Sequence, residues 1–162
     1  MTLVEEVMVS STLKEYYQKW GKQYAIDGKI SSTYKGFYKS GKRDMAPWLQ
    51  LKLVTPQTVS GLEVVNRADG YGEQLKRLII RAGMDAVPDR QAMALLRHNK
   101  RVATFKGPGV TGKTYKIMFE KPVLAQYITI QKEDYTLQIN EVRVLVQRMN
   151  SGIVQSCINV VL

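Results

Sequence analysis

One stretch of the sequence has the residue types and spacing of a phosphate-binding loop. Gly107, Gly112, Lys113 and Thr114 match the pattern Gly-x-x-x-x-Gly-Lys-Thr, in which backbone amides cradle phosphates and the lysine reaches the terminal one. Such a loop works when a helix follows it, because the helix N-terminus supplies further amides and a favourable dipole. After Thr114 the apolar residues alternate as in a strand. We therefore interpret the segment as a glycine-rich turn between two strands.

No other group of residues indicates catalysis. His98 is the single histidine, and no cysteine or second histidine stands at a spacing suited to a shared metal ion. No nucleophile is paired with His98 at a recognisable spacing either. We interpret His98 as a solvated loop residue and predict that the protein is not an enzyme.

The chain is basic, with 24 Lys and Arg residues against 14 Asp and Glu and a formal net charge of +10. This excess favours anionic partners such as nucleic acid, sulfated glycans or acidic lipid headgroups, but it also fits a surface that only serves solubility. Between Lys14 and Arg43, eight basic residues are interleaved with the aromatic residues Tyr16, Tyr17, Trp20, Tyr24, Tyr34, Phe37 and Tyr38. Such a mixture can bind polyanions, although packing of these rings against the core is the simpler interpretation.

The elements that would position these residues are predicted to be mainly β-strands. Short runs of alternating apolar residues, with turn residues between or near their ends, favour a sandwich or barrel. The predicted strands are Trp48–Val54, Val59–Asn66, Leu75–Ala82, Arg101–Lys106, Lys113–Phe119, Ala125–Gln131 and Gln138–Gln147. Short helices are expected at Leu13–Trp20 and within Asp85–His98, and the segment from Tyr24 to Met45 is expected to form long structured loops.

Length and composition predict a single domain over residues 1–162. Residues 148–162 form either a C-terminal extension or a last strand, and the apolar run Ile153–Leu162 could instead form an oligomer contact. No apolar run approaches the roughly 20 residues that a membrane-spanning helix needs. The lone Cys157 cannot form an intrachain disulfide, and the N-terminus shows no secretory signal, which leaves the compartment open.

Several short motifs follow one another in a specific order. They are Ala25-Ile-Asp27-Gly28, Pro47-Trp48-Leu-Gln-Leu, Asn66-Arg67-Ala-Asp69, Gly107-Pro-Gly, Tyr127-Ile-Thr-Ile and Asn140-Glu141-Val. In this order and at about these separations, the motifs resemble the F-type lectin (fucolectin) domain, whose wider relatives are the discoidin domains of coagulation factors. The resemblance covers roughly residues 10–147. It implies an all-β fold, the eight-stranded jelly-roll β-sandwich that the turn spacing also suggests.

The resemblance also implies a ligand site, and this sequence departs from the family's fucose-binding pattern there. Arg67 and Asp69 match the family's arginine and aspartate, but Ser40 stands at the histidine position and Gln74 at the second basic position. Tyr71 lies where typical members carry part of a cysteine pair, and its ring could stack on a sugar. An alternative is that Arg67 and Asp69 form an ion pair that only supports the fold.

The same family binds a structural calcium ion, and the resemblance places Asp27 and Glu141 at its acidic positions. Lys29 occupies a position where an oxygen ligand is expected. Calcium takes six to eight oxygen ligands, and an ammonium group in that shell would repel it. We therefore expect no bound metal or other cofactor, and we hypothesise that the Lys29 ammonium bridges Asp27 and Glu141 instead.

These observations predict a non-catalytic, fucolectin-like carbohydrate-recognition module. Its ligand is expected to bind loops at one end of the sandwich, around Lys39, Ser40, Arg67, Asp69, Tyr71 and Gln74. Two alternatives keep the fold: a structural, adhesive or assembly protein that oligomerises and has lost sugar binding, and a basic-surface binder of polyanions, with nucleic acid not favoured. The family resemblance favours a secreted, extracellular or virion-surface location.

Overall fold

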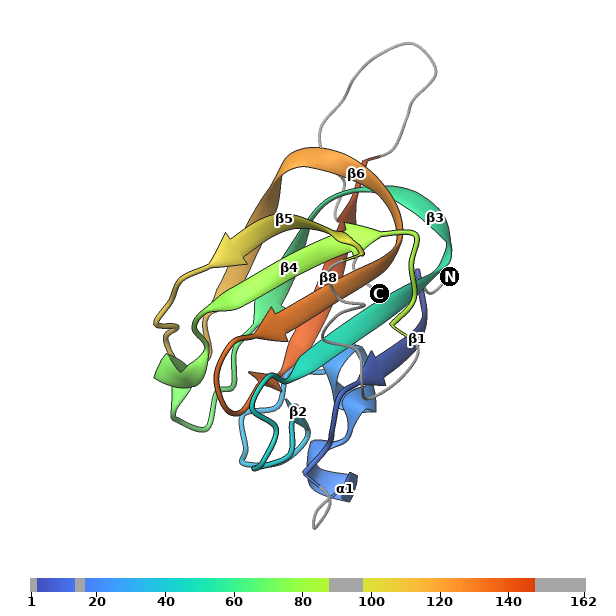
Figure 1. Cartoon of the computed structure of the whole chain (residues 1–162). Helices are drawn as coiled ribbons and strands as arrows, with labels where there is room; N and C mark the ends of the chain where they lie inside the picture. The colour runs from blue at the N-terminus through green and yellow to red at the C-terminus, as the bar shows by residue number, and fades with distance from the viewer. Residues whose placement is uncertain (1–2, 14–16, 88–97, 148–162) are drawn as a thin grey trace.

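Two long bent strands organise the chain in the computed structural model (Figure 1). The structure describes residues 3–13, 17–87 and 98–147. β3 (Trp48–Val65) and β6 (Thr114–Lys132) run antiparallel and pair along most of their length. Their pairing shifts between Lys52 and Gln57, where Pro56 has no N–H to offer the ladder. Both strands curve, so each contributes to two layers of a sandwich.

The remaining strands complete the two layers and close one end. The first layer has the order β1–β3–β6–β4–β5, and in the second layer β8 pairs with the C-terminal half of β3. β2 and β7 form a separate two-stranded sheet at the lower end in Figure 1. The strands are β1 (Val4–Val9), β2 (Tyr38–Lys39), β4 (Leu78–Gly83), β5 (Lys100–Phe105), β7 (Gln138–Ile139) and β8 (Glu141–Val146); the helical turns are α1 (Tyr17–Trp20), η2 (Lys22–Ala25) and η3 (Gly72–Gln74). This architecture confirms the predicted all-β, eight-stranded sandwich within the described residues.

The core lies between the two layers, where the alternation of apolar residues directs every second side chain inward. Leu49, Leu51 and Leu53 of β3 are fully buried, as their spacing predicts. On the opposite face of this strand, Trp48 and Gln50 are also buried. Trp48 packs against Val87 there, and Gln50 is satisfied by Thr129 and the Val87 amide. Both faces of β3 are therefore covered at its start.

Several predicted boundaries differ from the observed ones. Four predicted strands form only two in the structure, because β3 and β6 each continue through a bend. The run predicted at Gln138–Gln147 is divided at Asn140, whose side chain bonds to the backbone of Ser31. β4 begins at Leu78, not Leu75, since the preceding residues form the turn η3 and its exit. β1 was not predicted.

The helical predictions hold only in part. Of the helix expected at Leu13–Trp20, the structure describes α1 at Tyr17–Trp20; residues 14–16 lie outside the described part. Leu13 is buried, and its N–H bonds to the carbonyl of Lys39 in β2. The helix expected within residues 85–98 falls mostly outside the described residues, as do the segment 148–162 and its apolar run, so the single domain over 1–162 stays a prediction. No helix that the structure describes is long and apolar enough to cross a membrane.

Candidate functional site

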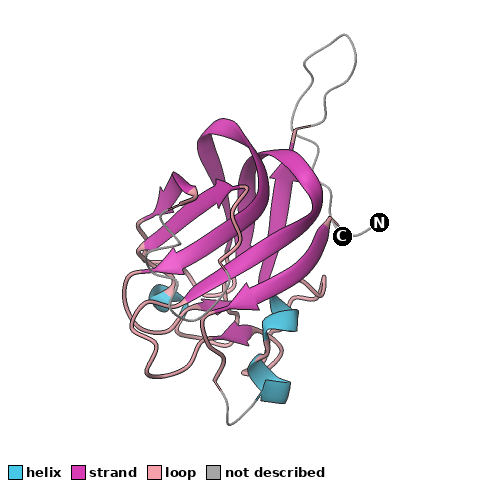
Figure 2. Cartoon of the chain, turned by 45° about the vertical axis from the view of Figure 1, so that its right-hand side comes forward, coloured by secondary structure: helices cyan, strands magenta, loops and turns pink. Residues whose placement is uncertain are grey.

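The loops at the lower end of the sandwich bring together most of the residues predicted to bind a ligand (Figures 1 and 2). Lys39 in β2 pairs directly with Gln138 in β7. Their neighbours Tyr38 and Ile139 are buried in the core, so Lys39 and Gln138 share the opposite face of this small sheet. The loop that follows β3 carries Arg67 to the same place, as its contacts show.

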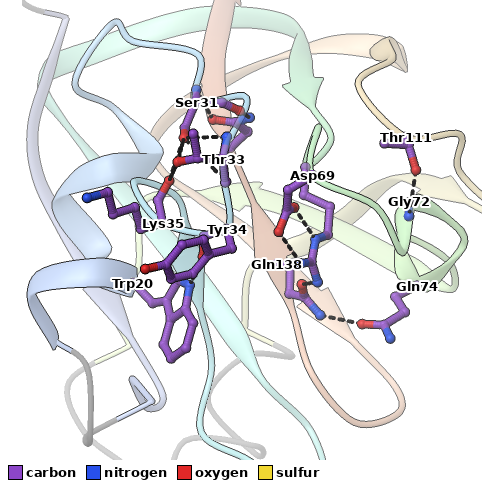
Figure 3. Close-up of polar contacts among 12 residues, drawn as sticks. Trp20, Ser31, Thr33, Tyr34, Lys35, Asp69, Gly72, Gln74, Thr111 and Gln138 are labelled. Carbon is purple, nitrogen blue, oxygen red and sulfur yellow. Dashed lines mark hydrogen bonds and ion pairs between the residues drawn. The ribbon is translucent and has the colours of Figure 1, made fainter.

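The Arg67 guanidinium is the centre of this site and is held by acceptors on Asp69 and Gln138, which Figure 3 labels. Its Nε and Nη2 donate to the two carboxylate oxygens of Asp69 at 2.8 and 2.7 Å, and its Nη1 donates to Gln138 Oε1. Gln138 in turn donates to Gln74 Oε1. The side chains of Arg67 and Asp69 are only 8% and 10% exposed. The hydrogen bonds from Arg67 hold the pKa of Asp69 below its usual value.

Two aromatic rings enclose the same guanidinium. The Arg67 Cζ lies 5.0 Å from the ring centroid of Phe37 and 5.1 Å from that of Tyr71. Phe37 is buried, whereas Tyr71 is 63% exposed. Tyr71 has a φ of 55°, the left-handed region, which a non-glycine residue adopts at a cost and which marks an imposed conformation. The Arg67 guanidinium is therefore held in place, and the exposed Tyr71 ring covers it on the side of the solvent.

A network of hydrogen bonds to a neighbouring loop fixes the backbone of this site. Asn66 Nδ2 donates to the carbonyls of Gly72 and Val110 at 2.8 and 2.9 Å, and Gly72 N–H donates to Thr111 Oγ1 at 3.1 Å (Figure 3). A Cβ at position 72 would lie 2.1 Å from the Thr111 nitrogen, so only glycine fits. These hydrogen bonds join the two loops into one unit.

The segment that matches the phosphate-loop pattern serves this same unit. It connects β5 to β6, and Thr114 begins a strand instead of a helix. Gly112 N–H donates to the carbonyl of Arg67 at 2.7 Å, and Gly109 N–H donates to that of Leu75 at 2.8 Å. Its amides are thereby engaged with protein acceptors. The interpretation of Gly107–Thr114 as a turn between strands is confirmed.

Lys39 lies beside the Arg67 group. Its Nζ is 5.3 Å from the centroid of the Trp20 ring, and the Trp20 Nε1 donates to the carbonyl of Tyr34 at 2.7 Å (Figure 3). Partial burial lowers the pKa of Lys39, and the nearby positive charges of Arg67 and Lys42 lower it further against the opposing effect of Asp69. Lys39 is therefore a half-buried cation in a positive environment.

Ser40 is placed differently from the other predicted ligand residues. It is fully buried, its Oγ accepts a hydrogen bond from Leu137 N–H at 2.9 Å, and its own N–H donates to the Leu137 carbonyl. Its hydroxyl is therefore not presented at the surface that Lys39, Arg67, Tyr71 and Gln74 share. The side chain instead braces the segment that leads into β7.

The F5/8 type C domain family model matches residues 6–142. The chain belongs to this family. No curated protein matches the sequence. Among solved structures, a fucolectin from striped bass (Morone saxatilis) serum has 22% identity and a TM-score of 0.74, over 91% of this chain and 48% of that one. The chain thus spans about half the length of that relative.

Two solved binding modules of bacterial origin are also similar to this F5/8 type C domain. A Streptococcus pneumoniae fucose binding module has 17% identity and a TM-score of 0.64, covering 86% of this chain and 89% of the module. The family 32 CBM from C. perfringens NanJ, in complex with galactose, has 18% identity and a TM-score of 0.67, over 86% and 91% of the two chains. At these identities the likeness shows the fold.

The acidic pair of the calcium pattern lies at a second corner of this F5/8 type C domain. Glu141 is 2% exposed, and its Oε1 accepts a hydrogen bond from the Gly28 N–H at 3.3 Å. Its Oε2 is buried and has no hydrogen-bond partner among the described residues. Burial raises the pKa of Glu141 to about 7, and the nearby Asp27 carboxylate contributes in the same direction.

The hypothesis that Lys29 bridges this pair is wrong. The Lys29 side chain is exposed, its backbone N–H donates to Asp27 Oδ1 at 2.9 Å, and within the described part of the chain no ion pair joins it to Asp27 or Glu141. An exposed ammonium keeps its hydration, which a bridge to the buried Glu141 would remove.

The side-chain oxygens of Asp27 and Glu141 do not by themselves supply the ligand shell of a calcium ion. One oxygen of Asp27 and one of Glu141 each accept a backbone N–H, which leaves too few carboxylate oxygens toward the six to eight that calcium requires. Lys29 stands at a position where the family pattern has an oxygen ligand. Within the described residues, no group of three His, Cys, Asp or Glu side chains could hold a metal ion.

Sequence reasoning missed three members of the site: Gln138, Trp20 and Phe37. Gln138 bonds to Arg67 and Gln74, although it is 71 and 64 residues away from them in the sequence. The only sequence feature that could have pointed to Gln138 is a polar residue at the start of a buried run. Trp20 and Phe37 belong to the basic and aromatic segment Lys14–Arg43, whose rings the sequence analysis interprets as packed against the core. Phe37 is buried as that interpretation requires, yet its ring also contacts the guanidinium.

Proposed function

We propose that this F5/8 type C domain is a non-catalytic carbohydrate-recognition module that binds a glycan at the end of the sandwich that carries β2 and β7. In this proposal the exposed Tyr71 ring stacks on an apolar face of a sugar, and Arg67 and Gln74 hydrogen-bond to its hydroxyl groups. Asp69 and Gln138 orient the guanidinium. Ser40 does not contact the sugar but supports the loop beneath it.

The observation that carries this proposal is the arrangement around Arg67. Its bonds to Asp69 and Gln138 leave N–H donors of the guanidinium uncommitted. The Phe37 and Tyr71 rings and the Asn66 network hold these donors in one orientation before any ligand arrives. A preformed set of directional donors beside an exposed aromatic ring is the composition of a sugar site, because a sugar presents hydroxyl edges and apolar faces.

Similar structures support the same class of ligand. The relatives of like fold include a fucolectin, a fucose binding module and a galactose complex. The loss of the family's histidine and second basic residue, replaced here by the buried Ser40 and by Gln74, argues for a sugar other than the one that the fucose pattern selects. The assembly alternative rested on the apolar tail within residues 153–162, which lies outside the described part, and on the loss of the family's pocket residues.

The test is a glycan array followed by calorimetric titration of each bound glycan. The Tyr71→Ala variant is expected to weaken binding about tenfold or more, because it removes the stacking surface. Tyr135→Ala is the matched control, since Tyr135 is an exposed tyrosine on another loop, at 55%. Binding by the control should equal that of the wild type. An array without any bound glycan, or equal binding by all three proteins, would contradict the proposal.

A further inference from the structure

Lys39 extends the site beyond the sugar contacts proposed above. It lies opposite Gln138 in the β2–β7 ladder, so its side chain leaves the sheet on the face that carries the Arg67 group. Its ammonium is positioned over the face of Trp20, at 5.3 Å from the ring centroid. A cation over an indole face is held by the negative potential of the ring, which orients the ammonium without neutralising it.

The charges around Lys39 do not balance. Arg67 and Lys42 are the nearby cations, and Asp69 is the one carboxylate that acts on Lys39. Both oxygens of Asp69 are already bonded to Arg67. Among the residues that the structure describes, no carboxylate lies within ion-pair distance of Lys39 Nζ, and no acceptor is hydrogen-bonded to it.

This imbalance is costly unless an anion compensates it. A half-buried ammonium has lost part of its hydration, and its three N–H donors meet no acceptor among the described residues. The lowered pKa of Lys39 has the same physical origin, namely burial and neighbouring positive charge. An anionic group placed on Lys39 would regain both the hydrogen bonds and the charge balance.

We propose that the module selects an acidic glycan, in which Lys39 binds a sulfate or carboxylate group of the sugar next to the one that stacks on Tyr71. This inference rests on the proposed function and names the class of glycan. Sulfate and carboxylate share the chemistry required here: a negative charge with several acceptor oxygens. The Trp20 ring would border the anionic sugar on the side away from Arg67.

A glycan fits the site better than nucleic acid does. A phosphate backbone presents one charge after another and is bound by a row of cations along a groove. Here one half-buried lysine lies over the Trp20 ring, and the nearby arginine is already neutralised by Asp69. That arrangement suits a single anionic group attached to a sugar.

The closing experiment uses fucose- and galactose-terminated oligosaccharides, each in a neutral, a sulfated and a carboxylated form. The proteins are the wild type, Lys39→Gln, Lys39→Arg and the control Lys121→Gln, which removes an exposed lysine near the middle of β6. We expect the wild type to bind one or both anionic forms about tenfold more tightly than the neutral form, the magnitude of a charged hydrogen bond. Lys39→Gln should lower the affinity for the anionic forms to that for the neutral form, whereas Lys39→Arg and Lys121→Gln should retain the preference.

The outcomes separate this inference from the proposed function. Equal binding of neutral and anionic forms by the wild type would overturn the acidic-glycan inference and leave the sugar-binding function standing. Loss of the preference in Lys121→Gln to the same degree as in Lys39→Gln would also overturn it, because general charge attraction would then be the cause. If the protein bound a single-stranded oligonucleotide and none of the glycans, both the acidic-glycan inference and the proposed sugar-binding function would be overturned.

Discussion

The Arg67 group and the Glu141 carboxylate are two buried charged regions of the same domain, and they differ in how fully protein groups satisfy their charge. Arg67 is paired with Asp69, bonded to Gln138 and enclosed by two rings. Glu141 has one oxygen bonded to a backbone amide and one with no partner among the described residues. The first region holds its charge in place with protein groups, whereas the second leaves part of a buried carboxylate unsatisfied.

This difference shows what each region is suited to do. A charge that is fully oriented by protein partners costs no reorganisation when a ligand arrives, so it suits recognition. A buried carboxylate that has no ion-pair partner favours its protonated form, so its ionisation follows the pH of the surroundings. The two regions should therefore respond to different perturbations, one to substitution and the other to pH.

The largest effect is expected from Arg67→Met. The substitution removes the cation from a buried pair and leaves Asp69 and Gln138 without their donor, which typically costs about 3–5 kcal/mol of stability. Urea unfolding with linear extrapolation measures this loss. Arg143→Met is the matched control, because the Arg143–Glu63 pair is more exposed and has a longer contact of 3.7 Å; it should lose about 1 kcal/mol or less. Equal losses in the two variants would remove the contrast between a built site and an ordinary ion pair.

A smaller effect is expected from Glu141→Gln, and it should depend on pH. The pKa of Glu141 rises from an ordinary 4.5 to about 7 on folding, so the folded protein binds more protons than the unfolded chain between these values. Wild-type stability should therefore fall as the pH rises from about 4.5 to about 7. The variant should lack this part of the decline and be the more stable protein above pH 7.

Thermal melts across this pH range test the Glu141 prediction. Glu73→Gln, which removes an exposed carboxylate on η3, serves as the control and should keep the wild-type profile. Parallel profiles of the wild type and Glu141→Gln would show that another group controls the pH dependence. The corner would then not be the unsatisfied region that the comparison requires.

The smallest expected effect is that of calcium. Because backbone amides occupy one oxygen of each carboxylate and Lys29 replaces a ligand, an excess of calcium should leave the melting temperature unchanged. Melting curves with calcium and with a chelator measure this. A melting temperature that rises with the logarithm of calcium concentration would show binding to the folded state and would contradict the prediction.

Local patterns predicted the strands better than they predicted the site. Alternation located Leu49, Leu51 and Leu53 in the core, and a strand after Thr114 was enough to reject a nucleotide loop. The ordered motifs also placed Arg67, Asp69 and Tyr71 together. Ser40 and Lys29 were placed less well, because a sequence position in a family pattern does not fix where a different side chain points.

The sequence by itself determined the sandwich and the identity of its central cation, because strand periodicity, turn residues and short motifs are local features of the chain. Only the tertiary structure decided which groups surround that cation. Gln138, Phe37 and Trp20 reach Arg67 or Lys39 across long sequence separations, through the β2–β7 ladder and the loops that pack against it. Burial and charge balance arise from such non-local contacts, so the proposal that Lys39 binds an anionic group rests on neighbours that only the tertiary structure shows.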